Sequence, residues 1–142
     1  MPDFISAQSP YLRENGAIYP VLITPSFAAI DLSKLEKKDV PHIKVRALFD
    51  TGAQTTAISE RVFSQLKLKP RGTVKVHTSQ SDKIVDEYDI ALEFDSNMYL
   101  NNLRVITANL KKFSIDCLIG RDVLQFGVFT YDGPNKSFRL TF

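Results

Sequence analysis

Hydrophobic and polar residues alternate over several short stretches of this chain, a pattern typical of β-strands with one buried face. Between residues 43 and 49, apolar side chains alternate with basic ones before an apolar pair ends the stretch. Residues 103–107 and the apolar run 117–119 are two further strand candidates. Turn-forming residues separate the stretches, and little of the chain has helical spacing. The pattern therefore predicts a mainly β protein with antiparallel sheets.

Two β-hairpins are predicted. Residues 73–77 and 84–94 flank a polar tip at 79–82, and in the longer segment Tyr88, Ile90, Leu92 and Phe94 alternate with Asp89, Ala91 and Glu93. A second hairpin closes the chain between residues 128 and 142, around the turn Asp-Gly-Pro-Asn at 132–135. Polar turn residues between two alternating runs are a good hairpin signal.

The N-terminal part of the chain is less regular. Residues 20–24 are apolar and β-branched, and prolines at 20 and 25 border them, which predicts a short or edge strand. Residues 1–19 carry no clear pattern. The charged segment 31–39 is predicted to be a solvated connection, with one helical turn as the alternative.

Two short helices complete the expected elements. Ser59 is a candidate N-cap for the first, Glu60 stands in its first turn, and the helix should end before Pro70. The second helix is expected at 122–126. Gly127 follows it, where a left-handed C-terminal residue is common.

Composition limits the possible functions. The 142 residues fit one domain spanning 1–142, of which 1–40 would form the N-terminal strand and the charged connection. Eighteen Lys and Arg against sixteen Asp and Glu are scattered along the chain, so nucleic acid is not an expected partner. There is no apolar run of about 18 residues and no secretory signal pattern, so no membrane partner and a cytoplasmic location are expected.

Cysteine and histidine are scarce. Cys117 is the only cysteine, so it cannot form an intrachain disulfide, and His42 and His77 leave a Cys/His zinc site short of ligands. Six glycines form no Gly-rich phosphate loop. We therefore expect no metal and no cofactor, and we predict that Cys117 is a small buried hydrophobe.

The most informative segment is Leu48-Phe49-Asp50-Thr51-Gly52-Ala53. Asp-Thr-Gly is a weak signal by itself, but here it ends an apolar strand and precedes a small residue. A second apolar pair ending in glycine, Leu118-Ile119-Gly120, follows about seventy residues later. From about residue 43 to the C-terminus, the chain resembles the retroviral-type, or retropepsin-like, aspartic proteases, a single-lobe family with non-viral members.

The resemblance implies a fold, a reaction and a partner. The fold would be a closed, barrel-like arrangement of antiparallel sheets with one or two short helices. Hydrolysis of a peptide bond without metal requires two carboxyl groups that share one proton and activate a water. One chain supplies only Asp50, so the resemblance implies a two-fold homodimer acting on a polypeptide substrate.

The resemblance also assigns supporting roles around Asp50. Thr51 would join a hydrogen-bond lattice between the two loops, and Gly52 would let backbone approach the carboxylates closely. Leu118 and Ile119 would pack behind the loop, and Gly120 would give a tight passage into the helix.

Two more regions take roles from the resemblance. Arg121 and Asp122 would tie protomers together through a buried ion-pair network, and a charged first helical turn is the alternative. The first hairpin would be the flap that closes over substrate, although a plain surface hairpin has the same pattern. The residues at its tip are Ser79, Gln80, Ser81 and Asp82.

Ala53 suggests a pH range for the reaction. A serine here could donate a hydrogen bond to the ionised carboxylate, whereas alanine cannot. We therefore expect a pH optimum nearer weakly acid to neutral than strongly acid.

The sequence is compatible with three functions. The leading hypothesis is an aspartic endopeptidase that uses Asp50 from each protomer. The first alternative is a retropepsin-like peptide-binding or regulatory domain with little or no proteolysis, because a fold does not guarantee an activity. The second is a nucleic-acid-binding β domain, for which the mild positive charge is the main support. Asp-Thr-Gly in a turn of an unrelated β protein remains the non-functional interpretation.

Overall fold

The computed structural model of the chain describes residues 4–26, 40–95 and 98–142. The charged segment predicted at 31–39 lies outside these described residues. Within them, no helix has the length and apolar character needed to cross a membrane.

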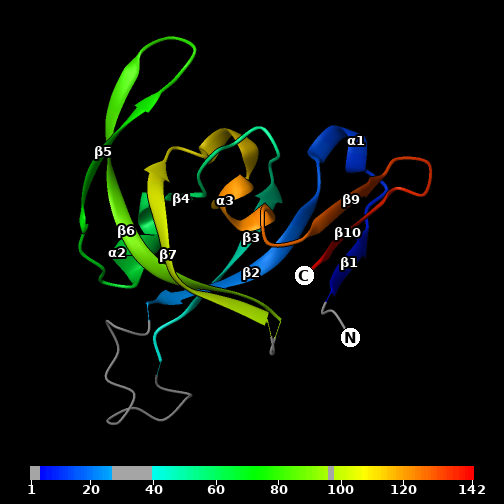
Figure 1. Cartoon of the computed structure of the whole chain (residues 1–142), viewed down its shortest axis with the longest axis horizontal. Helices are drawn as coiled ribbons and strands as arrows, with labels where there is room; N and C mark the ends of the chain where they lie inside the picture. The colour runs from blue at the N-terminus through cyan, green and yellow to red at the C-terminus, as the bar shows by residue number, and fades with distance from the viewer. Residues whose placement is uncertain (1–3, 27–39, 96–97) are drawn as a thin grey trace.

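Six strands close into a barrel, which confirms the prediction of a mainly β protein (Figure 1). Around the barrel the strands are β2 (Ile18–Pro25), β3 (Ile43–Phe49), β8 (Cys117–Ile119), β4 (Ala57–Ser59), β7 (Met98–Ala108) and β6 (Asp82–Asp95). Strand β6 pairs back onto β2, and this pairing closes the ring. The β3–β8 and β4–β7 pairs are parallel, and the other pairs of the barrel are antiparallel.

Strand β2 is not an edge strand, so that part of the prediction was wrong. It pairs with β3 along residues 18–23 and with β6 along residues 22–25. Proline has no N–H to donate to a neighbouring strand. Pro20 lies before the pairing of β2 with β6 begins, so no hydrogen bond to β6 is lost there. The proline that suggested an edge therefore occupies only the half of β2 with a single neighbour.

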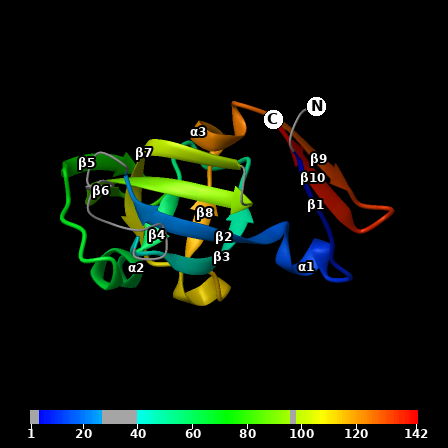
Figure 2. The same ribbon diagram turned by 90° about the horizontal axis from the view of Figure 1, so that it is seen from below.

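A second sheet of three strands stands beside the barrel (Figure 2). Its order is β1 (Phe4–Gln8), β10 (Ser137–Thr141) and β9 (Val128–Asp132), and α1 (Leu12–Asn15) leads from β1 to the barrel. The predicted C-terminal hairpin is thus confirmed. Strand β1 had no sequence signal, because its partner β10 comes from the opposite end of the chain.

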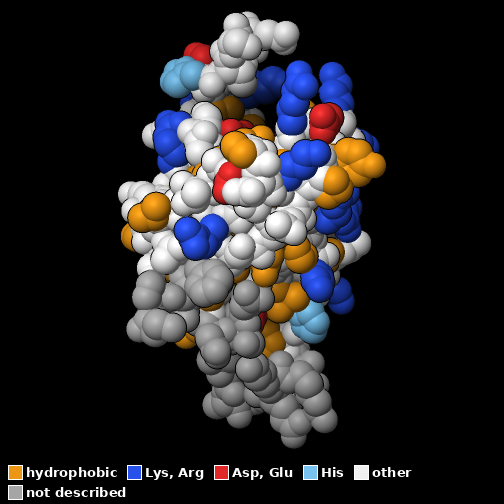
Figure 3. Space-filling model, turned by 90° about the vertical axis from the view of Figure 1, so that its right-hand side faces the viewer, with side chains coloured by type: hydrophobic (Ala, Val, Ile, Leu, Met, Phe, Trp, Pro, Cys, Tyr) orange, Lys and Arg blue, Asp and Glu red, His pale blue; other side chains and the backbone are white. Residues whose placement is uncertain are grey.

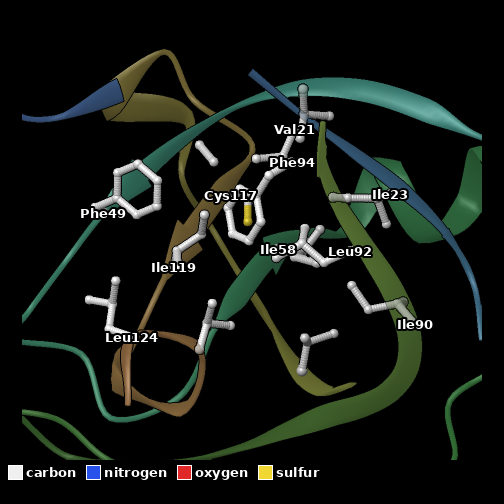
Figure 4. Packing of buried hydrophobic residues seen from close by; sticks show 14 of the residues in the cluster. Val21, Ile23, Phe49, Ile58, Ile90, Leu92, Phe94, Cys117, Ile119 and Leu124 are labelled. Carbon is white, nitrogen blue, oxygen red and sulfur yellow. The ribbon is translucent and has the colours of Figure 1, made fainter. Parts of the chain in front are cut away.

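Buried hydrophobic side chains fill the barrel (Figure 4). The same core cluster includes Phe138 and Leu140 of the second sheet. Phe49 joins the two parts, because its ring lies 6.1 Å from that of Phe94 in the barrel and 5.4 and 5.8 Å from those of Phe129 and Phe138 in the second sheet. Cys117 of β8, which pairs with Ala47 of β3, is fully buried, as predicted, and burial raises the pKa of its thiol. Phe49 therefore anchors the end of β3 immediately before Asp50.

The predicted helices exist, but their ends differ. Helix α2 (Glu60–Gln65) has Ser59 at its N-cap position, without a capping hydrogen bond from the Ser59 side chain. Helix α3 (Arg121–Leu124) is shorter than expected. Gly127 does not have a positive φ, so its predicted left-handed role was wrong. A Cβ at this position would instead collide with the Thr141 carbonyl oxygen at the end of β10.

The first predicted hairpin is formed by β5 (Gly72–His77) and β6, with strands longer than the sequence pattern indicated. Strand β5 pairs with β6 beyond the closed ring, and the hairpin extends past the barrel at the upper left of Figure 1. Strand β7 is also longer than the predicted 103–107. Its polar residues 101 and 102 interrupt the alternation, and they lie where the register with β6 shifts, between the pairs Ile90–Leu103 and Leu92–Leu100.

Candidate active site

Asp50 begins a loop that is held in place by backbone hydrogen bonds. We call residues 50–56 the Asp50 loop. The N–H of Asp50 donates to the Ile119 carbonyl at 2.9 Å, so the loop starts with a bond to β8. The Gly52 N–H donates to Asp50 Oδ1 at 2.8 Å, and the Ala53 N–H donates to the Asp50 carbonyl at 3.2 Å. A Cβ on Gly52 would lie 3.1 Å from Asp50 Oδ1, so glycine allows this close approach.

The start of α3 supports the other side of the loop. The Arg121 backbone N–H donates to the Ala53 carbonyl at 2.9 Å, and its guanidinium donates to the Thr51 carbonyl at 2.8 Å. Gly120 touches the loop directly, because a Cβ there would lie 2.9 Å from the Thr55 carbonyl carbon. The predicted tight passage at Gly120 is therefore a close contact between two backbones.

Thr56 is the residue that sequence reasoning missed. It is fully buried, and its hydroxyl donates to Asp122 Oδ1 at 2.7 Å and accepts from the Gly120 N–H at 3.1 Å. The Thr56 N–H donates to Asp122 Oδ2 at 2.9 Å, and the Val123 N–H donates to Oδ1 at 2.9 Å. No local pattern identifies a partner 66 positions away. Asp122 thus fastens α3 to the end of the Asp50 loop.

The residues predicted to support Asp50 divide into two groups. Ile119 is fully buried behind the loop, as expected. Leu118 is only half-buried and faces a cleft, because alternate residues of β8 point to opposite sides. Arg121 and Asp122 bond to the loop of their own chain. Their predicted network between protomers stays a prediction.

The β5–β6 hairpin, which we call the flap hairpin after its predicted role, has a tip that is held by short-range hydrogen bonds. The tip residues are 78–81, one position earlier than predicted, because Asp82 already pairs with His77 in the strands. The Thr78 N–H donates to the Ser81 carbonyl at 3.0 Å, and the Ser81 N–H donates to the Thr78 hydroxyl at 3.1 Å. His77 Nδ1 lies 2.6 Å from Asp82 Oδ1. The predicted tip residues Ser79, Gln80, Ser81 and Asp82 are all exposed.

A cleft of about 1570 Å³ lies between this flap hairpin and the Asp50 loop. Gly52 and Ala53 line it at one side, and Val74, Val76 and Val85 of the hairpin line it at another. Strands β4 and β7, helix α2 and the short helix η3 (Lys111–Phe113) complete its walls. Small-molecule pockets span roughly 300–1,000 Å³, so this cleft has room for part of a polymer.

One ion pair stands in the cleft wall. Arg61 Nε donates to Asp116 Oδ1 at 2.9 Å, and Arg61 Nη2 contacts Asp116 Oδ2 as well. The hydrogen bond from Arg61 lowers the pKa of Asp116 against the opposing effect of desolvation, and Ser59 contributes to the lowering. The same hydrogen bond raises the pKa of Arg61. Both side chains are therefore charged at neutral pH.

Residues 39–126 match the model of a protein family described as "gag-polyprotein putative aspartyl protease". The matched segment contains the Asp50 loop, the flap hairpin and α3. A search among curated protein sequences found no match.

Several solved structures are similar to the chain. EIAV protease bound to an inhibitor is 18% identical, with a TM-score of 0.55, over 83% of this chain and 93% of that one. A retropepsin-like aspartic protease from Rickettsia conorii is 14% identical, with a TM-score of 0.49, over 100% and 97%. The retroviral protease-like domain of Ddi1 from Leishmania major is 17% identical, with a TM-score of 0.47, over 82% of each chain. The similarity to the first of these shows the fold.

Proposed function

The chain belongs to the retropepsin-like aspartyl protease family, and from this membership we propose that it is a homodimeric aspartic endopeptidase. Asp50 from each of two protomers would form the catalytic pair. The substrate would be a polypeptide bound in extended form between the flap hairpin and the Asp50 loop.

The chemistry follows from placing two carboxyl groups together. Like charges about 3 Å apart cannot both ionise, so one Asp50 would keep a proton while the other is charged. The charged carboxylate accepts a proton from water, which attacks the carbonyl carbon of the peptide bond. The protonated partner polarises the carbonyl oxygen, and a proton then passes to the leaving nitrogen as the C–N bond breaks.

The observation that supports this proposal best is how Asp50 is held. Its backbone is bonded to β8 and its carboxylate to the Gly52 N–H, while its side chain remains half-exposed beside the cleft. A catalytic carboxylate has to be held in one geometry and still reach its substrate. Both features favour a catalytic role for Asp50, and Gly52 and Ala53 of its loop line the cleft.

The second sheet suggests where the other protomer would lie. Strand β9 is an edge strand within the described part of the chain, since β10 occupies its one paired side. Its Phe129 contacts Phe49, the last residue of β3 immediately before the Asp50 loop. Val128, its first residue, is 67% exposed, and Phe126, two positions before it, is 60% exposed. An open edge with exposed apolar side chains suits pairing with a second copy.

Replacement of Asp50 tests the proposal. In Asp50→Asn we expect kcat/KM on a mixed peptide library to fall by about 10²–10⁴-fold, because the general base is lost. The melting temperature should hardly change. Asp89→Asn is a matched control, since Asp89 pairs with Arg71 outside the cleft and its loss should leave cleavage unchanged.

Two results would refute the proposed endopeptidase activity. One is equal cleavage by Asp50→Asn and the parent. The other is a sedimentation velocity profile of a strict monomer at high concentration, because one protomer holds only half of the carboxylate pair. A monomer that still binds peptides would support the alternative, a peptide-binding domain without proteolysis.

A further inference from the structure

The charges that line the cleft are unequal. Four acidic residues and six Lys or Arg residues line it. The basic residues are Arg61, Lys75, Lys83, Arg104, Lys111 and Arg121. Figure 3 shows Lys and Arg side chains beside the hollow beneath the flap hairpin, which stands at the top of that view.

Most of the acidic groups already have partners. Asp116 is bonded to Arg61, and Asp122 accepts three hydrogen bonds from the Asp50 loop and α3. Glu87 Oε2 lies 3.9 Å from Arg104 Nε. Glu60 stands in the first turn of α2, where the helix N-terminus favours a carboxylate. These acids therefore offer little attraction to a basic substrate.

Two lysines keep their charge available to a ligand. Lys83 faces Val76 across the flap hairpin, and Val74 faces Val85 two positions further along. Alternate residues share a face, so Lys83 lies on the same face as the three valines that line the cleft. Lys111 is exposed on η3, at the far wall. Among the described residues, neither lysine has an acidic partner within 4.0 Å.

We propose that this cleft selects peptides that carry Asp or Glu side chains, with Lys83 and Lys111 as the residues that recognise them. The inference rests on the proposed function to the extent that the occupant of the cleft is a peptide. Ile106, Leu118 and the flap valines supply apolar contacts for neighbouring side chains. The preferred peptide therefore combines apolar and acidic residues.

Electrostatics explains why the preference should be measurable but modest. Both lysines are exposed, and exposed charge pairs are weakened by water and by salt. Several weak attractions along one peptide act together, and they also raise the rate of association. The preference for acidic peptides should accordingly shrink as the ionic strength rises.

Binding to the Asp50→Asn variant tests the inference without cleavage. Three fluorescent peptides share an apolar framework and differ in carrying Glu, Gln or Lys at the variable positions. Fluorescence anisotropy gives their dissociation constants at low and at high salt. We expect the Glu peptide to bind most tightly and the Lys peptide most weakly, with the differences reduced by salt.

Variants then assign the effect to residues. Lys83→Gln and Lys111→Gln should each weaken binding of the Glu peptide by about two- to fivefold and leave the Gln peptide nearly unaffected. Lys112→Gln is the matched control for Lys111, because Lys112 is its exposed neighbour on η3 but does not line the cleft. Lys69→Gln serves the same purpose for Lys83.

Equal binding of the three peptides would overturn the inference. An equal loss of affinity for the Glu peptide in the cleft variants and in their controls would also overturn it. Salt-dependent binding of a single-stranded oligonucleotide, with no discrimination among peptides, would show that the positive charge serves nucleic acid instead. Failure of the proposed function is seen separately, as absence of cleavage by the parent chain, and it leaves these binding results interpretable.

Discussion

The Asp50 loop and the tip of the flap hairpin face the same cleft, but they are held in different ways. The loop is bonded to β8 and α3, segments about seventy residues further along the chain, and its Thr56 is fully buried. The tip at 78–81 is exposed, and the hydrogen bonds within it join residues no more than three positions apart. One region is positioned by the whole fold, and the other by its own turn.

This difference matches the two tasks that the proposed reaction requires. A carboxylate that activates water must keep its geometry throughout the reaction, so long-range bonds around it are useful. A hairpin that closes over different peptides must adapt its shape, and a tip with only local bonds can open at low cost in free energy. The same type of side chain, threonine, allows the comparison to be tested at both places.

Thr56→Val should have the largest effect on stability. Valine keeps the shape of threonine but removes the hydroxyl, so the Asp122 carboxylate and the Gly120 N–H lose a buried partner. Leaving such groups unsatisfied costs about 1–3 kcal/mol in the free energy of unfolding. Urea denaturation followed by circular dichroism measures the loss. A stability equal to that of the parent would show that the loop is not held by this network.

The Arg61–Asp116 pair should give a smaller, pH-dependent effect. Asp116 has a lowered pKa in the folded chain, so the pair stabilises the protein above the unfolded pKa of about 3.9 and its contribution is lost as the pH falls through the folded value. Because Arg61 is 51% exposed, the contribution is about 0.5–1 kcal/mol at neutral pH.

Asp116→Asn measures that contribution. The difference in unfolding free energy between parent and variant should be greatest near pH 7 and should shrink as the pH falls below the unfolded pKa of about 3.9 and through the lowered pKa of the folded chain, where the parent carboxylate also becomes neutral. Urea titrations over this range are the measurement. A difference that stays constant across it would mean that packing, and not charge, stabilises this wall of the cleft.

Thr78→Val should have the smallest effect on stability, within about 0.5 kcal/mol, because the hydroxyl it removes is exposed. The variant loses the bonds that shape the tip, so KM for a peptide should change more than the melting temperature does. Steady-state kinetics and a thermal melt of the same sample test this. If Thr78→Val destabilised the chain as much as Thr56→Val, the contrast between the two regions would be wrong.

Local pattern was sufficient for much of the fold. Alternation along residues 43–49 identified β3, and the alternating runs on either side of residues 78–81 identified the flap hairpin. Asp50, Gly52 and Gly120 were recognised because a short motif and its spacing carry them. Each of these features depends on neighbours in the chain, which is why the sequence indicated them.

Other features depend on partners that are distant in the chain. Strand β1 exists because β10 pairs with it, and β2 is no edge because β6 closes the barrel over its second half. Thr56 acquires its role only when α3 brings Asp122 beside it. Gly127 looked like a helix terminus, but the passing end of β10 requires the glycine.

The sequence by itself therefore determined the strand-rich class and the single Asp-Thr-Gly, which under the proposed function is half of a carboxylate pair. The tertiary structure decided how that loop is held and which charges face the cleft. The physical reason is range: side-chain periodicity reports which face of a segment is buried, whereas hydrogen-bond partners and cleft walls are set by contacts between segments that only the closed barrel brings together.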